Sequence, residues 1–274
     1  MSFWQNVLRV MDTQMETPDA YGLFHLVSLV LVVVSAVGLC LWHRKSGSPK
    51  RVVDVVFAVA VTVVVMEVYK LVNYSFSYED GIGFDFPWYV FPWQFCSTPM
   101  YVGILAGIVR KGKVHESLCA YLATYSLFAG AAVMLYPGDV FIGTVGINIQ
   151  TMFCHGSMIA VAVYLMVSGY VKLEHETILK AMPVFAVTVM IAMILNEVAY
   201  QTGLLETDTF NMFYISPYCD PYLPVYSIVQ EMVAYPWCLI IYIAGFTAAA
   251  YLSLLLAMLV RKLASGKKAA VTAV

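Results

Sequence analysis

Long apolar runs separated by short polar loops dominate the sequence. Seven of these runs reach roughly twenty residues, the length that a helix needs to cross a bilayer core of about 30 Å, and they occupy residues 21–42, 52–73, 89–109, 116–135, 148–171, 178–200 and 232–260. The pattern predicts an all-α membrane protein, a seven-transmembrane-helix bundle in one domain over residues 21–260. Residues 1–20 are expected to form an outer interfacial segment, with a helix at 3–11, and residues 261–274 a basic cytoplasmic tail.

Composition agrees with this pattern and narrows the possible partners. Of the 274 residues, 61% are hydrophobic and 12% are charged, whereas about 25% are charged in soluble proteins. The net charge of −2 averages two different surfaces and gives no reason to expect nucleic acid as a partner. The six cysteines have no CxxC spacing, so we expect no metal site and no cofactor. Cys219, in an outer loop, could pair with another outer cysteine. Nothing in the sequence indicates an oligomeric state.

Basic residues alternate between the loops. They follow the first, third and fifth runs and recur in the tail, whereas Arg9 is the only basic residue in the remaining loops. Because loops rich in lysine and arginine stay in the cytoplasm, the N-terminus is expected outside and the C-terminus inside. We therefore expect a multi-pass protein of the cell membrane.

Polar side chains interrupt the outer halves of these runs, while the inner halves are nearly free of them. Such groups are costly within a bilayer unless they pair or reach water, so they predict a polar cavity that opens on the exoplasmic side. Glu67 and Lys70 share a helical face and can neutralise one another, and a purely structural ion pair would explain them equally well. The expected cavity residues are His25, Glu67, Lys70, Gln94, Cys96, Asn148, His155, Asn196, Glu197 and Glu231.

The third run places a thiol, an amide and two prolines where plain hydrocarbon is expected. Pro92 suits the first turn of a helix, and Pro99 lacks the N–H that would bond to the carbonyl of Phe95. A helix that begins near Pro92 puts Cys96 in its second turn, where the positive end of the dipole favours a thiolate. The alternative is a buried cysteine that acts as a small hydrophobe.

His155 is the expected partner of Cys96. It lies on one helical stripe with Asn148 and Thr151, roughly 10 Å below the outer end of its helix, and Cys96 is expected at a similar depth. Cys154 points about 100° away from its neighbour His155.

A cysteine and a histidine within reach are the minimum for acyl transfer through a thioester. Gln94, Lys70 or Asn196 could stabilise the oxyanion, and Glu67, Glu197 or Glu231 could orient the imidazole. A site of this kind that opens sideways to the bilayer would act on a membrane phospholipid or another lipid ester.

These motifs resemble the bacterial YwaF-like integral membrane proteins. The resemblance rests on the outer-end His25, on Glu67 and Lys70, on Gln-Phe-Cys-Ser-Thr-Pro-Met-Tyr at 94–101 and on Cys-His-Gly-Ser at 154–157, and it covers about Tyr21 to Leu259. That family is similar to the eukaryotic transmembrane protein 164, which resembles a lipid acyltransferase with a membrane cysteine and histidine. The resemblance implies a bacterial plasma-membrane enzyme with Cys96 as nucleophile and His155 as base.

Two other classes of membrane protein are alternatives to an enzyme. A retinal-binding photoreceptor needs a lysine in the last helix, and residues 236–260 contain none. A receptor or transporter for an exoplasmic small molecule or lipid needs the polar cavity but not the nucleophile. The substitution Cys96→Ser separates the two, because a binding pocket tolerates it and thiol catalysis does not.

Overall fold

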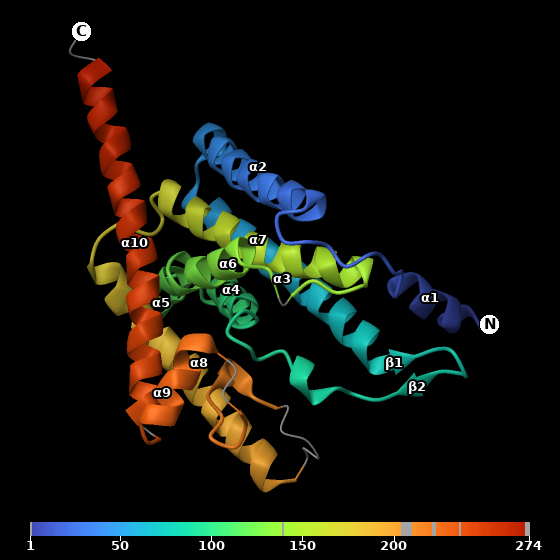
Figure 1. The fold of residues 1–274 in the computed structure, drawn as a ribbon. Helices are drawn as coiled ribbons and strands as arrows, with labels where there is room; N and C mark the ends of the chain where they lie inside the picture. The colour runs from blue at the N-terminus through green and yellow to red at the C-terminus, as the bar shows by residue number, and fades with distance from the viewer. Residues whose placement is uncertain (1, 139, 204–209, 221–222, 236, 272–274) are drawn as a thin grey trace.

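The computed structural model describes residues 2–138, 140–203, 210–220, 223–235 and 237–271, and these form a helical bundle with one small hairpin (Figure 1). The helices are α1 (Phe3–Met11), α2 (Leu23–Ser46), α3 (Pro49–Ser75), α4 (Thr98–Val109), α5 (Gly112–Ala123), α6 (Tyr125–Leu135), α7 (Val145–Val167), α8 (Glu176–Gln201), α9 (Pro224–Met232) and α10 (Trp237–Val271). Strands β1 (Phe76–Ser77) and β2 (Gly83–Phe84) pair antiparallel, with Phe76 opposite Phe84. Single turns of 3-10 helix lie at Trp88–Val90 and Met212–Tyr214.

Among the described residues, six helical segments are long and apolar enough to cross a membrane. They are α2, α3, the pair α5–α6, α7, α8 and α10 as far as Ser265. The predicted third span at 89–109 is helical only over the 12 residues of α4, about 18 Å against a bilayer core of about 30 Å. The prediction of a continuous helix from near Pro92 is therefore wrong.

The segment before α4 is held by side chains instead of by helical hydrogen bonds. The indole Nε1 of Trp93 donates to the carbonyl of Thr188 at 3.2 Å, and the hydroxyl of Tyr101 donates to the carbonyl of Pro92 at 2.9 Å. Non-helical backbone is tolerated at membrane depth only where protein covers it and satisfies its polar groups. Such tertiary anchors are invisible in the apolar pattern, which explains the error.

Helix α4 runs antiparallel to α3 and reaches the opposite end of the bundle from the hairpin. Gly103 allows the contact, since a Cβ there would lie 2.8 Å from the Cβ of Ala60. At the end of α4, the guanidinium of Arg110 lies 2.8 Å from the carboxylate of Asp54, near the start of α3. The segment that precedes α4 is therefore level with the second half of α3, which carries Glu67 and Lys70.

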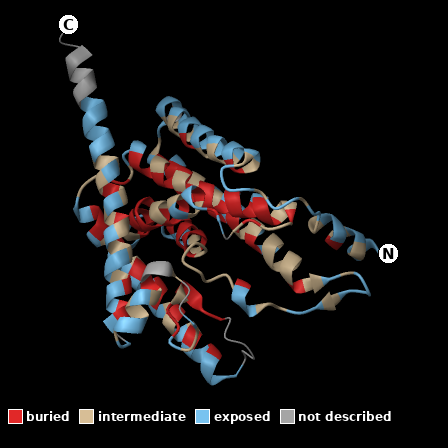
Figure 2. Cartoon of the chain, in the orientation of Figure 1, coloured by how far each residue is buried: buried red, intermediate tan, exposed pale blue. Residues whose placement is uncertain are grey.

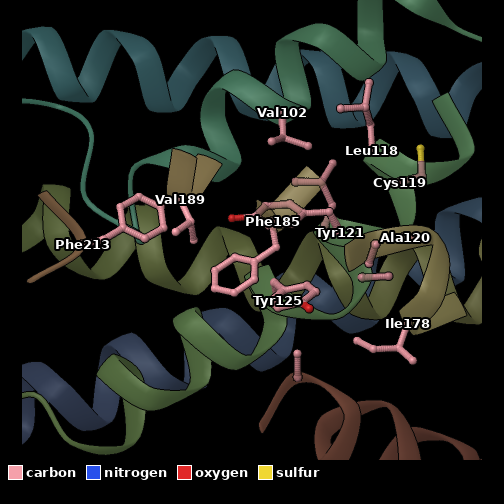
Figure 3. Packing of buried hydrophobic residues seen from close by; sticks show 14 of the residues in the cluster. Val102, Leu118, Cys119, Ala120, Tyr121, Tyr125, Ile178, Phe185, Val189 and Phe213 are labelled. Atoms are coloured by element: carbon pink, nitrogen blue, oxygen red, sulfur yellow. The ribbon is translucent and has the colours of Figure 1, made fainter. Parts of the chain in front are cut away.

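Aromatic side chains fill the centre of the bundle (Figure 3). Tyr125 stacks on Phe185 of α8 with ring centroids 4.4 Å apart, and Tyr121 stacks on Tyr125 at 5.5 Å. Between these two tyrosines, Thr124 breaks the predicted span 116–135 into α5 and α6, and its hydroxyl donates to the carbonyl of Ala120 at 2.7 Å. Both rings are fully buried.

The N-terminal segment is tied to the hairpin. Residues 3–11 form the expected helix α1, and Gln5 Nε2 donates to the carbonyl of Tyr78 at 3.0 Å. The hydroxyl of Tyr78 donates to Asp12 at 3.0 Å, and this bond raises the pKa of the phenol because it favours the protonated form. The N-terminal segment and the hairpin therefore lie at one end of the bundle.

Helix α2 is the least covered of the long helices, and Figure 2 shows it almost wholly exposed or intermediate. Only His25 and Ala36 on it are buried, and it packs against α7. At the other end of the chain, α10 continues through the predicted tail to Val271, and residues 272–274 lie outside the described residues.

Candidate functional site

The buried ion pair on α3 is linked to α7 through an amide. The Nζ of Lys70 lies 2.5 Å from Oε1 of Glu67, and Glu67 is 5% exposed. From α7, Gln150 Nε2 donates to Oε2 of Glu67 at 3.2 Å and lies 3.4 Å from the sulfur of Cys154. One oxygen of the carboxylate thus lies in an ion pair and the other accepts a hydrogen bond, which fits the expectation that charges within a membrane protein are paired.

Cys96 and Cys154 line one small cavity, here called the thiol cavity. It has a volume of about 30 Å³, enough for about one water molecule. Side chains from α3, α4, α5, α6 and α7 surround it, among them Val59, Ser157 and Val161. Cys96 precedes the first residue of α4 by two positions, so it lies just before the positive end of that helix and not in its second turn.

The two ring nitrogens of His155 have different surroundings. Its Nδ1 lies 2.8 Å from the carbonyl of Thr151; a carbonyl only accepts, so Nδ1 holds the proton of the neutral ring. The Nε2 atom is buried and has no hydrogen-bond partner within the part of the chain that the structure describes. Most buried polar atoms are hydrogen-bonded, so such an exception calls for an explanation.

Lys70 connects the predicted catalytic residues electrostatically. Its ammonium group lies within electrostatic reach of the thiols of Cys96 and Cys154 and of the His155 ring. Among the described residues no hydrogen bond joins Cys96 to His155. The structure therefore pairs Glu67 with Lys70 directly, whereas within the described residues Cys96 and His155 share no contact and His155 is not among the residues that line the thiol cavity.

His25 is used differently from His155. Its Nδ1 accepts from the backbone N–H of Tyr21 at 2.9 Å, and its Nε2 lies 2.9 Å from the carbonyl of Met134. Both ring nitrogens are therefore engaged with backbone, and the ring joins the start of α2 to the end of α6.

Three amides bind a loop in what we call the amide clamp. Gln94 accepts from the N–H of Phe213 at 2.9 Å and donates to the carbonyl of Asn211 at 3.0 Å. Asn196 accepts from the N–H of Met212 at 2.8 Å and donates to its carbonyl at 3.0 Å. Asn211 completes the clamp by accepting from the N–H of Ser216 at 2.9 Å.

The clamp holds an unusual backbone. Phe213 and Tyr214 have φ of 60° and 56°, a left-handed conformation that is rare for bulky residues. Both amide ends of Gln94 and of Asn196 are committed to this loop. Asn148 acts similarly, because it accepts from the N–H of Ile142 at 3.0 Å and donates to its carbonyl at 2.7 Å.

The two remaining carboxylates are exposed. Glu197 accepts from the hydroxyl of Tyr218 at 2.6 Å and from Gln201 at 2.7 Å, and the bond to the carboxylate raises the pKa of Tyr218 to about 12. Glu231 lies on α9, a helix separate from α10, and is exposed. In this conformation neither carboxylate contacts His155.

Sequence reasoning missed Gln150 as the link between the two helices and Cys154 as a second thiol of the same cavity. A signal was present, since residues 150 and 154 are four apart and share a helical face. The described cysteines form no disulfide, and the described residues contain no group of three or more histidine, cysteine, aspartate or glutamate side chains that could hold a metal ion.

The comparisons with known proteins identify a family. The sequence pattern of the TMEM164 family matches residues 20–258, a range that includes all of α2 to α9 and most of α10. The comparisons with curated proteins and with solved structures find no match. The chain therefore belongs to the TMEM164 family.

Proposed function

We propose that this protein is a thiol-dependent lipid acyltransferase or esterase of the YwaF-like bacterial group, with Cys96 as nucleophile and His155 as general base. The observation that carries the proposal is the buried, unpartnered Nε2 of His155, whose ring is held in the correct tautomer by the carbonyl of Thr151. In a base, one nitrogen is oriented and the other accepts the proton. The contrast with His25, which has both nitrogens engaged, supports this choice.

The reaction has two steps. In the first, Nε2 of His155 takes the thiol proton, the Cys96 sulfur attacks the ester carbonyl of a lipid, and the C–O bond breaks. The leaving alcohol takes the proton from the imidazolium, and the acyl group remains as a thioester. In the second step, a lipid alcohol or water gives its proton to His155 and attacks the thioester, which returns Cys96 to the thiol.

Lys70 is the proposed stabiliser of the oxyanion. Its charge reaches Cys96 and His155, and it acts in a site that excludes most water. Gln94 and Asn196 are less suited to stabilise the oxyanion, because both ends of each amide are already hydrogen-bonded in the amide clamp.

The orientation belongs to the same proposal. We count α4, with the irregular segment before it, as an interrupted seventh span, because Arg110 at its end pairs with Asp54 near the start of α3. Seven crossings put the N-terminus outside and the C-terminus in the cytoplasm of a bacterial plasma membrane, which agrees with the alternation of basic loops. The thiol cavity, lined from Val56 to Val63 on α3 and from Cys154 to Val161 on α7, then lies near the middle of the bilayer.

The proposal is tested by trapping the thioester. Purified protein in lipid nanodiscs is incubated with phosphatidylcholine that carries a heavy-isotope acyl chain, and the intact mass is measured. We expect one added acyl group on Cys96, released by neutral hydroxylamine. It should be absent in Cys96→Ala and slow to form in His155→Gln. Cys154→Ala, which alters the other thiol of the same cavity, should still acylate.

Three results would overturn the assignment. An acyl group on Cys154 would show that Cys154, and not Cys96, is the nucleophile. Equal acylation of wild type and His155→Gln would show that His155 is not the base. If folded wild-type protein takes up no acyl group but binds the lipid in a Cys96-independent manner, the polar cavity is a receptor or transport site.

A further inference from the structure

A groove between α2 and α7, with a volume of about 820 Å³, borders the thiol cavity. This volume falls within the range of roughly 300–1,000 Å³ that is usual for ligand sites. Facing stripes of the two helices form its walls, from Leu23 to Leu39 on α2 and from Ile149 to Val161 on α7. Residues at spacings of three and four share one helical face, so the walls are continuous. We call this cavity the α2–α7 groove.

The groove joins the thiol cavity. Val59, Ser157 and Val161 line both, so a chain in the groove passes beside the cavity that holds Cys96. Ser28, Ser35 and Ser157 provide its only side-chain hydroxyls, and the rest of the described lining is apolar or glycine. A headgroup would find few partners here, whereas a hydrocarbon chain matches the lining.

We propose that the α2–α7 groove holds the acyl chain of the lipid substrate and that Gly38 keeps open the end of the groove that borders the thiol cavity. The inference rests on the proposed acyl transfer at Cys96. The stripe of α7 from Ile149 to Val161 is about 18 Å long at 1.5 Å per residue, close to the roughly 15 Å that the chains of one leaflet fill in a bilayer core of about 30 Å. A single lipid chain therefore fits along it.

Glycine shapes the groove at two places. At Gly156, an added Cβ would lie 2.4 Å from Cγ2 of Val32, so this glycine lets α2 approach α7 beside the junction with the thiol cavity. At Gly38, near the inner end, an added Cβ would meet nothing within 4 Å. A large side chain at Gly38 therefore fits without moving the helices and fills the end of the groove. Any side chain at Gly156 would push the helices apart instead.

The test uses Gly38→Phe and a matched control, Gly245→Phe. Gly245 lies on α10, is exposed, and also has open space around its position, so both variants add a phenyl group to the surface of a long apolar helix. Binding is measured first in the Cys96→Ser background, where no thioester can form. Nanodiscs contain phosphatidylcholine with a photoreactive diazirine near the end of one acyl chain, and crosslinked peptides are mapped by mass spectrometry.

We expect crosslinks on the α2 and α7 peptides that line the groove. Gly38→Phe should lower their yield about fivefold, because the phenyl group takes the place of one or two methylene contacts of the chain, and Gly245→Phe should not. With Cys96 restored, Gly38→Phe should slow acylation of Cys96, and Gly245→Phe should not. Crosslinks spread evenly over the helices, or an equal yield in Gly38→Phe and Gly245→Phe, would overturn the inference.

The two proposals fail in different ways. Groove crosslinks that Gly38→Phe reduces, together with no thioester in wild type, would keep the groove as a lipid site and reject the acyl transfer. A thioester on Cys96 that forms at the wild-type rate in Gly38→Phe would keep the acyl transfer and place the acyl chain elsewhere.

Discussion

Two groups of polar side chains, both expected in one exoplasmic cavity, have opposite characters. In the first group, the pair Glu67–Lys70 is linked through Gln150 to Cys154, a thiol of the thiol cavity, and His155 keeps an unpartnered nitrogen. In the amide clamp, Gln94, Asn196 and Asn211 are bonded to the backbone of residues 211–216. Spare bonding capacity is kept only in the first group. A buried polar group that is fully bonded stabilises structure, and one that is not is available for chemistry.

The largest effect is expected where the charged pair is broken. Lys70→Met leaves the carboxylate of Glu67 without its partner and should cost about 3 kcal/mol of unfolding free energy, at the lower end of the usual range because Lys70 is 19% exposed. Equilibrium unfolding in mixed detergent micelles measures this loss of unfolding free energy.

The double variant Glu67→Gln with Lys70→Met sharpens this result. A neutral amide no longer needs the ammonium group, so most of the lost stability should return, while acylation of Cys96 stays slow because the oxyanion has lost its cation. If Cys96 in the double variant is acylated at the wild-type rate, the ion pair has only a structural role.

A smaller effect is expected in the amide clamp. Asn196→Leu leaves the N–H and the carbonyl of Met212 unpaired in a buried site and should cost about 2 kcal/mol, while the rate of Cys96 acylation at a permissive temperature is unchanged. Glu197→Gln, at the next and exposed position, is the matched control and should change stability little. A loss of acylation in folded Asn196→Leu would mean that the clamp belongs to the site.

The smallest effect concerns the exposed bond between Tyr218 and Glu197. The carboxylate raises the pKa of Tyr218 to about 12, so the contribution of the bond to stability is complete below the ordinary tyrosine pKa of about 10 and is lost as the pH rises through the folded value. Glu197→Gln should let Tyr218 ionise at lower pH, as followed by tyrosinate absorbance with Tyr218→Phe as reference. An unchanged titration would show that this bond does not form in solution.

The sequence predicts much of the fold, because apolar length is a strong signal. Helix α2 begins two residues after the predicted start of its span, and α8 covers the whole of the predicted 178–200. The third span differs most from its prediction: Trp93, Gln94 and Tyr101 hold the chain before α4 through contacts with residues that are distant in sequence or outside the helix. Apolar periodicity carries no information about such bonds.

For the site, the sequence predicts which residues are polar but not what each one bonds. His25 and His155 look alike as single imidazoles in apolar helices, and only their partners distinguish them: backbone on both nitrogens for His25, and one free nitrogen for His155. Gln94 and Asn196 could not be assigned to a loop because residues 211–216 have no regular pattern. The roles of Cys96 and His155 in chemistry stay predictions.

The central claim is that His155, unlike His25, activates Cys96. The most direct measurement is the rate at which an alkyl haloacetamide labels Cys96 in wild type, His155→Gln and His25→Gln, with the site mapped by peptide mass spectrometry. We predict that Cys96 is the fastest of the six cysteines, that His155→Gln slows it about a hundredfold or more, as loss of a general base does, and that folded His25→Gln does not. Equal rates in wild type and His155→Gln, or fastest labelling at Cys154, would contradict the account.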